Sequence, residues 1–132
     1  METVMARAAL PVFALGLYAL AAAAAVAQTA PAKTADTAKG KALVDGAGMT
    51  LYVYDRDSAG ASNCTGVCAN NWPPFNAPAD AKASGDWSVV ARKDGGRQWA
   101  YKGKPLYTFY KDGDPGDAKG DGVNSVWHVA AP

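Results

Sequence analysis

The sequence contains no isoleucine, and beyond residue 27 it has no glutamate and only three leucines, Leu43, Leu51 and Leu106. A core in this region must therefore be built from valine and aromatic rings, which favour β-strands. Aspartate fills every acidic position there, and aspartate favours turns and helix caps over helix interiors. These absences predict a mainly β fold with long loops.

The charge balance and the missing motifs exclude several classes of function. Residues 28–132 carry 12 Lys and Arg against 11 Asp, and this even balance gives no reason to expect nucleic acid or an acidic membrane surface as a partner. The chain has no nucleophile elbow, no paired-histidine metalloprotease motif and no phosphate-binding glycine loop. We therefore expect a non-catalytic protein without a cofactor.

Residues 1–27 have the layout of a secretory signal peptide. Arg7 precedes an uncharged apolar run, residues 8–26, and the small-residue triplet 25–27 supplies a cleavage site. A membrane-spanning helix is the alternative, because the run approaches the roughly 20 apolar residues that cross a bilayer. No cysteine lies near the cleavage point to carry a lipid, so we expect a periplasmic or secreted protein without a stable membrane anchor.

The remaining chain is expected to hold a short leader and one domain. Residues 28–41 contain no aromatic and no large aliphatic side chain, which predicts a flexible leader. Residues 42–132 are enough for one modest core and too few for two. We therefore expect a small single β-rich domain.

An internal repeat organises this domain. A shift of 55 positions places Leu51 on Leu106 and brings aromatic residues and an aspartate into register. Each copy reads Leu-Tyr-x-(Tyr/Phe)-x-x-Asp and reaches Trp after fourteen more residues. We place the two repeats at about residues 42–80 and 97–132. The repeated positions are Tyr52, Tyr54, Asp57 and Trp72 in the first copy and Tyr107, Phe109, Asp112 and Trp127 in the second.

The segment between the two motifs predicts a β-meander. The turn Lys93-Asp-Gly-Gly96 separates two runs rich in valine and aromatic residues, and an Asp-Gly pair in that position is a strong hairpin signal. A second turn at residues 102–104 leads into a third run. Strands are expected at residues 87–92, 97–101, 105–110 and 126–129.

These features resemble a known family. Two Tyr-x-(Tyr/Phe)-x-x-Asp motifs, the segment Cys64-Thr-Gly-Val-Cys68 and the segment Val126-Trp-His-Val129 fall together within residues 42–132. The chain resembles the secreted-repeat family of predicted bacterial lipoproteins with a Tyr-x-(Phe/Trp/Tyr)-x-x-Asp motif. The resemblance implies an extracytoplasmic β-rich repeat domain and no particular activity, ligand or catalytic residue. The chain departs from the lipoprotein label because it lacks the lipid-bearing cysteine.

Cys64 and Cys68 are the only cysteines, and in an exported protein a disulfide between them is the expected state. Such a bridge would fix the turn that delivers Trp72. A redox-active dithiol is the first alternative, but three residues separate the cysteines instead of two, and their loop holds no basic residue to stabilise a thiolate. A soft-metal site that adds Met49 and His128 is the second, although these residues are far apart in sequence.

His128 is the only histidine, and the sequence shows no triad or ligand partner for it. General acid-base catalysis requires a positioned partner for such a residue. We therefore expect His128 to be a hydrogen-bonded residue of the last short strand.

An acidic loop follows the second motif and resembles a calcium loop, because its carboxylates recur at short spacing. The match fails because Asp117 occupies the position that requires glycine and no glutamate ends the loop. We expect solvated turns and no metal, and an irregular calcium site is the alternative. The residues concerned are Asp112, Asp114, Asp117 and Asp121.

The motif aromatics have two interpretations. In a strand Tyr52 and Tyr54 share one face, opposite Leu51 and Val53. A domain so poor in leucine and isoleucine needs these rings as core, because each buries a large apolar area. The alternative is an exposed aromatic face that binds a small ligand or an unknown envelope partner. We expect a non-catalytic extracytoplasmic module, and the alternative from another class is a redox or metal-handling periplasmic protein that uses its cysteine pair.

Overall fold

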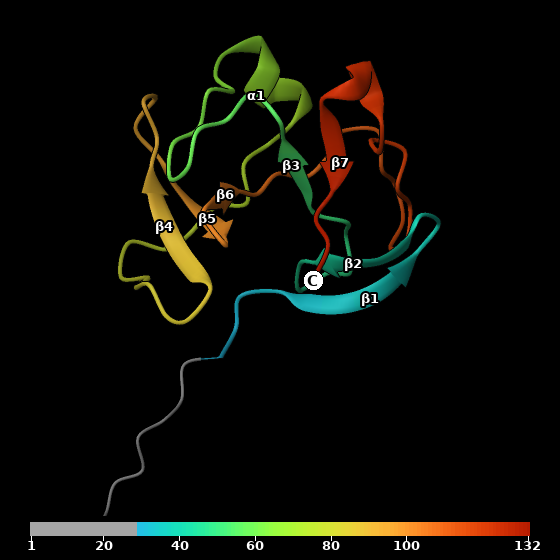
Figure 1. The fold of residues 1–132 in the computed structure, drawn as a ribbon, viewed down its shortest axis with the longest axis horizontal. Coiled ribbons are helices and arrows are strands. Elements are labelled where there is room, and N and C mark those ends of the chain that lie inside the picture. The colour runs from blue at the N-terminus through green and yellow to red at the C-terminus, as the bar shows by residue number, and fades with distance from the viewer. Residues whose placement is uncertain (1–28) are drawn as a thin grey trace, which may run out of the picture.

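The structure is a computed structural model that describes residues 29–132, so the expected signal peptide lies outside the described residues. The architecture is mainly β, with short strands and long loops, as the sequence predicts (Figure 1). In chain order the elements are β1 (Lys33–Thr37), β2 (Gly40–Val44), β3 (Tyr52–Tyr54), α1 (Val67–Asn71), β4 (Trp87–Ala91), β5 (Arg97–Tyr101), β6 (Lys104–Pro105), the 3-10 turn η2 (Val123–Ser125) and β7 (Trp127–Val129).

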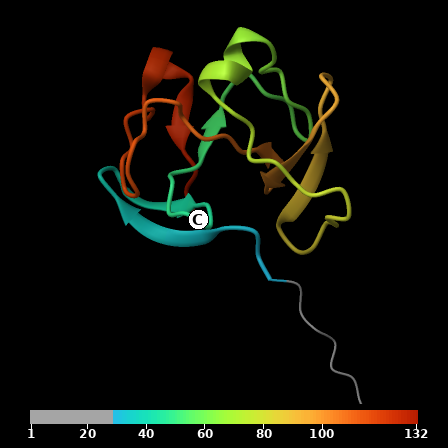
Figure 2. The same cartoon turned by 180° about the vertical axis from the view of Figure 1, so that it is seen from behind.

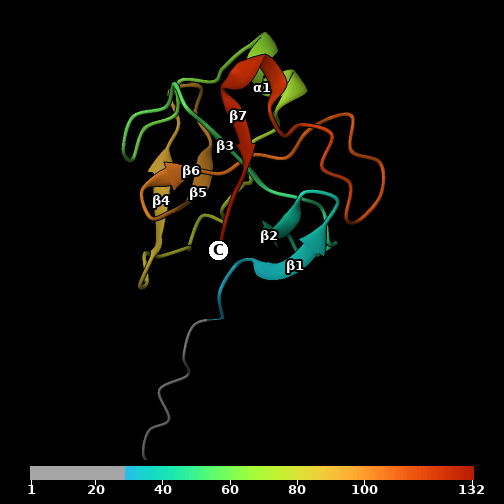
Figure 3. The ribbon, with the colours of Figure 1, turned by 45° about the vertical axis from the view of Figure 1, so that its right-hand side comes forward.

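The two repeats have the same order of elements. The shift of 55 positions takes the β1–β2 hairpin onto the β4–β5 hairpin, α1 onto the turn at η2, and Trp72 onto Trp127 at the start of β7. The two hairpins lie on either side of the β3–β7 pair (Figures 1 and 2), and the two helical turns lie together at one end (Figure 3). Each repeat is therefore a hairpin, a tyrosine segment, a helical turn and a tryptophan segment.

The flexible leader predicted for residues 28–41 is wrong from Lys33 onward. β1 pairs antiparallel with β2 along its whole length, and the hairpin is the counterpart of β4–β5. The prediction failed because it rested only on the lack of large apolar side chains within residues 28–41. The side chains that anchor this hairpin, Leu43 and Val44, are buried and lie on β2, while backbone hydrogen bonds hold the polar β1 against them.

The predicted meander is present, since β4, β5 and β6 form one antiparallel sheet. Its third strand is shorter than the predicted residues 105–110. Beyond β6 the chain turns toward the other repeat, where Tyr107 forms isolated bridges with Tyr52 and Pro74. Pairing with the first repeat therefore ends the meander.

Strands of the two repeats pair with each other. β3 from the first repeat pairs antiparallel with β7 from the second. In the reciprocal contact the Thr108 N–H donates to the Pro73 carbonyl at 2.8 Å, and the prolines there limit pairing because they have no N–H to donate. Between these contacts Tyr52 and Tyr107 exchange both backbone hydrogen bonds, at 2.8 and 3.0 Å. Each repeat thus supplies the strand partner of the other.

Two clusters of buried side chains form the core. The alternation predicted for β3 is observed, because Tyr52 and Tyr54 pack in the first cluster and Leu51 and Val53 in the second. The buried members of the first, the aromatic cluster, are Tyr52, Cys64, Trp72, Tyr107, Phe109 and Trp127. Those of the second are Ala32, Leu43, Leu51, Leu106 and Ala130.

Candidate functional site

Four rings of the repeated motif stack face to face inside the aromatic cluster. The order is Tyr54, Trp127, Trp72, Phe109, and we call this arrangement the ring stack. Its successive centroids are 4.2, 3.8 and 4.1 Å apart, with interplanar angles of 13°, 2° and 27°. The two equivalent tryptophans form the central pair, and each is followed by the ring that the other repeat supplies.

Two further tyrosines meet the central pair edge-on. The Tyr52 ring centroid lies 5.4 Å from that of Trp72 at an interplanar angle of 79°. Tyr107 lies 5.1 Å from Trp127 at 89°. Edge-to-face and offset stacked rings are the favourable aromatic geometries, because the ring edge is electropositive and the face electronegative.

Each of these tyrosines donates its hydroxyl to the motif aspartate of the other repeat. Tyr52 Oη donates to Asp112 Oδ2 at 2.6 Å, and Tyr107 Oη donates to Asp57 Oδ2 at 2.7 Å. The other oxygen of each carboxylate caps the loop that follows it, by accepting the backbone N–H of Asn63 at 2.7 Å or of Lys119 at 2.9 Å. The motif spacing thus serves a crossed pair of hydrogen bonds, which sequence reasoning missed.

Burial sets the protonation of these pairs. Burial raises the pKa of the Tyr52 hydroxyl, and its hydrogen bond to Asp112 raises it further. Burial likewise raises the pKa of Tyr107, with Ser62 opposing and Asp57 adding to the rise. The pKa of the Asp57 carboxyl also rises through burial, against the lowering by its hydrogen-bond donors. Both phenols therefore remain protonated donors throughout the physiological pH range.

The motif aromatics are core. Trp72 and Trp127 are 5% and 3% exposed, and Tyr52 and Tyr107 are fully buried. Tyr54 at one end of the stack is half-buried. The expected alternative, an exposed aromatic face that binds a ligand, is therefore wrong, because the two repeats cover each other's rings.

Gly120 packs directly against these rings. A Cβ at this position would lie 2.7 Å from a Trp72 ring carbon and 2.9 Å from a Tyr52 ring carbon. We expect Gly120→Ala to lower the free energy of unfolding by about 1–3 kcal/mol, because both rings must shift to admit the methyl group. Urea denaturation measures the change. Gly113→Ala is the control, since its added Cβ meets nothing within 4 Å, and equal midpoints for the two variants would contradict the tight packing.

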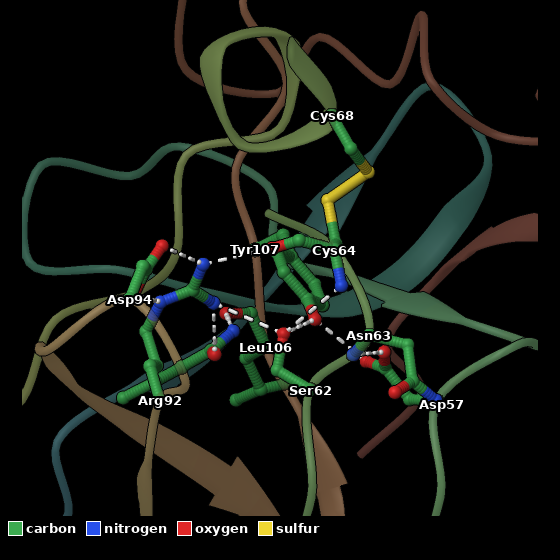
Figure 4. Close-up of polar contacts among 10 residues, drawn as sticks. Asp57, Ser62, Asn63, Cys64, Cys68, Arg92, Asp94, Leu106 and Tyr107 are labelled. Atoms are coloured by element: carbon green, nitrogen blue, oxygen red, sulfur yellow. Dashed lines mark hydrogen bonds and ion pairs between the residues drawn. A yellow bond between two sulfur atoms is a disulfide. The ribbon is translucent and has the colours of Figure 1, made fainter. Parts of the chain in front are cut away.

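The cysteine pair is a disulfide that closes the loop before α1, with an S–S distance of 2.05 Å and a Cα–Cα distance of 5.2 Å. Cys64 is fully buried in the aromatic cluster. Arg92 holds this loop from the inside (Figure 4). Its guanidinium donates to the Cys64 carbonyl at 2.8 Å, to Ser62 Oγ at 3.0 Å and to Gln98 Oε1 at 2.7 Å.

The Arg92 side chain is only 2% exposed and pairs with Asp94 at 2.7 Å. Burial by itself lowers the pKa of this guanidinium, but the hydrogen bond and charge of Asp94 reverse the effect and raise it. Arg92 therefore stays charged and forms a polar centre beside the disulfide. Sequence reasoning missed this role, because Arg92 reads only as the last residue of a predicted strand.

Most of the candidate metal ligands serve other contacts. The bonded cysteines offer no thiolate, and His128 Nε2 lies 2.7 Å from Asp55 Oδ2. Asp117 Oδ2 accepts two backbone N–H groups of its own loop at 3.0 Å, which lowers the pKa of the Asp117 carboxyl. Asp121 Oδ1 accepts the backbone N–H of a β7 residue at 3.0 Å. Among residues 29–132 no group of three or more His, Cys, Asp or Glu side chains could hold a metal ion.

A groove with charged edges lies beside β3, and we call it the Val53 groove. It consists of two adjoining hollows, each of about 270 Å³, that share Val53, Asp55, Lys102 and Lys104. Val53 adds apolar lining to both hollows. Further lining residues are Tyr54, Asp57 and Pro105 in one hollow and Tyr101, His128, Val129 and Ala130 in the other.

The charges of the Val53 groove are paired only in part. Asp55 and His128 bond each other, and both side chains are about half exposed, at 53% and 44%. Asp57 is engaged with Tyr107. Lys102 and Lys104 are exposed on a turn that contains a non-glycine residue with positive φ, Lys102 at 51°. The groove therefore presents two lysines to solvent beside the Asp55–His128 pair.

Comparison with known proteins places the chain in a family. Residues 33–76 and 88–131 each match the model of a secreted repeat of unknown function. The chain belongs to this family of secreted repeats. Each match begins with a hairpin, so the repeat boundaries predicted at 42–80 and 97–132 start too late. No curated protein and no solved structure matches this secreted repeat protein significantly. Within residues 29–132 no helix has the length and apolar character needed to cross a membrane.

Proposed function

We propose that this secreted repeat protein is a non-catalytic module of the periplasm or the extracellular space that binds a small ligand in the Val53 groove. The observation that carries the proposal is the pair of adjoining hollows lined by both apolar and exposed charged residues. Small-molecule sites are concave and mostly apolar, with a few polar groups that orient the ligand. The motif hydroxyls and carboxylates, by contrast, already form the hydrogen bonds that join the two repeats.

The chemistry of the groove favours a ligand with an anionic group and an apolar part. Lys102 and Lys104 line both hollows and offer two ammonium groups to a ligand. Val53 and Val129 offer apolar surface within reach of these charges. A carboxylate or phosphate attached to a short apolar body is complementary to this arrangement.

A binding role is better supported than a catalytic one. The His128–Asp55 pair has the form of a base with its orienting carboxylate, but within the described chain no hydroxyl or thiol side chain is hydrogen-bonded to His128. A nucleophile within reach of the base is the signature of covalent catalysis. The buried tyrosine hydroxyls are already donated to aspartates.

A thermal-shift screen of small aliphatic and aromatic carboxylates and phosphates tests the proposal. A compound that binds only the folded state raises the melting temperature. At a concentration of 100 times its Kd it adds about 2.7 kcal/mol to the free energy of unfolding. We expect such a rise in the wild type and its loss in the variant Lys102→Ala, Lys104→Ala. The matched control is Lys33→Ala, Lys39→Ala, which removes two exposed lysines from the β1–β2 hairpin. A rise that persists in the Lys102, Lys104 variant, or no rise with any compound, contradicts the proposal.

A further inference from the structure

We propose that the ring stack with its two tyrosine–aspartate pairs is a one-electron relay that accepts oxidising equivalents from organic radicals. In this relay the stack gives an electron, through Tyr54, to an organic radical outside the protein. The stack is left with an electron vacancy, that is, one electron too few. This vacancy then settles on Tyr107 or Tyr52, whose phenol proton passes to the hydrogen-bonded carboxylate. This activity is separate from ligand binding in the Val53 groove.

The first support is the continuity of the stack from the surface to the interior. Tyr54, at one end of the stack, is half-buried, so the stack reaches the protein surface at this residue. From there the centroid distances are 4.2 Å to Trp127 and 3.8 Å on to Trp72. Indole and phenol rings are among the side chains that lose an electron most readily, and transfer between rings in contact is fast because its rate falls steeply with distance.

The second support is the placement of the two tyrosine–aspartate pairs. Tyr107 lies edge-on to Trp127 and Tyr52 edge-on to Trp72, with centroid distances of 5.1 and 5.4 Å. An oxidised phenol is a very strong acid, so it must release its proton at once to hold the vacancy. The carboxylates that accept the two phenolic hydrogen bonds, at 2.7 and 2.6 Å, are already in place.

The step balances for either pair, and Tyr107 serves as the example. The radical gains one electron and becomes an anion. Tyr107 loses that electron through the stack and becomes a neutral phenoxyl radical, while its proton moves to Asp57, which becomes a neutral carboxylic acid. The raised pKa of Asp57 favours this transfer, since burial makes its carboxylate a better proton acceptor. An electron from a small reductant such as ascorbate reverses the step, and Asp57 returns the proton.

The two hydroxyl groups have further hydrogen-bond partners, since Tyr52 Oη accepts the Gly120 N–H at 3.1 Å and Tyr107 Oη bonds Ser62 Oγ at 2.6 Å. A phenylalanine ring would fill the space of Tyr52 or Tyr107, whereas burying a hydroxyl beside a carboxylate carries a desolvation cost that its hydrogen bonds must offset. Both repeats retain the hydroxyl and the carboxylate at equivalent positions. Each hydroxyl that joins the repeats is thus also placed to give its proton to a carboxylate, as a proton-coupled relay requires.

The test is photo-oxidation of the exported protein with a ruthenium polypyridyl complex and a sacrificial electron acceptor, followed by electron paramagnetic resonance. We expect a tyrosyl radical that is retained in Tyr110→Phe, a control that removes the hydroxyl of a 56% exposed tyrosine. The variant Tyr52→Phe, Tyr107→Phe is expected to lose this radical. It should also form more dityrosine-linked dimers than the wild type, because the vacancy then reaches exposed tyrosines. Near-UV circular dichroism verifies that each variant keeps its packed rings.

The single variants Tyr52→Phe and Tyr107→Phe keep the test decisive if the double variant does not fold. Each is expected to lose part of the radical signal and to retain the part that the other pair supplies. A radical that disappears in Tyr110→Phe, or that is unchanged in both single variants, overturns the proposal and assigns the oxidation to surface tyrosine.

Discussion

Trp127→Ala is expected to lower the free energy of unfolding by about 3–5 kcal/mol, the range for removing a large aromatic ring from a core. Trp127 is 3% exposed and stacks between Tyr54 and Trp72, with Tyr107 edge-on. Its loss leaves a cavity that rings from both repeats cannot fill by small shifts. Urea denaturation monitored by far-UV circular dichroism measures the change.

Tyr110→Ala is the control for this prediction. Tyr110 is 56% exposed and meets the stack only at Phe109, edge-on at a centroid distance of 5.3 Å. Its removal should cost about 1 kcal/mol, which is the scale of a single aromatic pair. If Trp127→Ala unfolds at the same urea concentration as Tyr110→Ala, the ring stack is not the centre of stability that its burial indicates.

Residues 28–80, produced alone, are expected to be unfolded. β3 has its strand partner, β7, in the other repeat. Tyr52 donates its hydroxyl to Asp112, and the two tryptophans of the central pair come from different repeats. A fragment that loses these contacts cannot bury enough apolar surface to offset the entropy of folding. Its far-UV circular dichroism should show no cooperative thermal transition.

Mixing this fragment with residues 81–132 provides the control. The two pieces together contain every contact between the repeats, so a cooperative transition is expected to return on mixing. A cooperative melt from residues 28–80 alone at low concentration would show that each repeat is an independent domain. A melt that appears only as the fragment concentration rises would instead show that two first repeats pair with each other.

Several parts of the fold could be predicted because they depend on local signals. The Asp-Gly turn before Arg97 placed the β4–β5 hairpin, and the period of two in β3 separated Tyr52 from Leu51. The β1–β2 hairpin could not be found in the same way. Its first strand, residues 33–37, is polar and mostly exposed, so only its equivalence to β4 under the repeat shift indicates a strand.

The candidate site was less predictable than the fold, since its parts come from distant segments. The Val53 groove joins β3 to the turn that carries Lys102 and Lys104, and no local pattern marks that meeting. Arg92 lies 28 residues from the Cys64 carbonyl that it binds. A charged residue at a strand end reads as solvent-exposed, because burial of a guanidinium depends on partners that only folding assembles.

Patterns along the chain were enough to predict the class of this protein: an expected exported chain, a mainly β domain, a duplicated motif and a cysteine pair in position to bond. They were enough because composition, strand alternation and internal repetition can be read along the chain without knowledge of which segments meet. The contacts between the two copies could be found only in the folded protein. The motif tyrosine of one repeat bonds the aspartate of the other, and the tryptophans stack across the repeat boundary. Two copies of one motif are as compatible with separate units as with crossed ones, and the crossed arrangement follows from the rings, which neither repeat can bury alone.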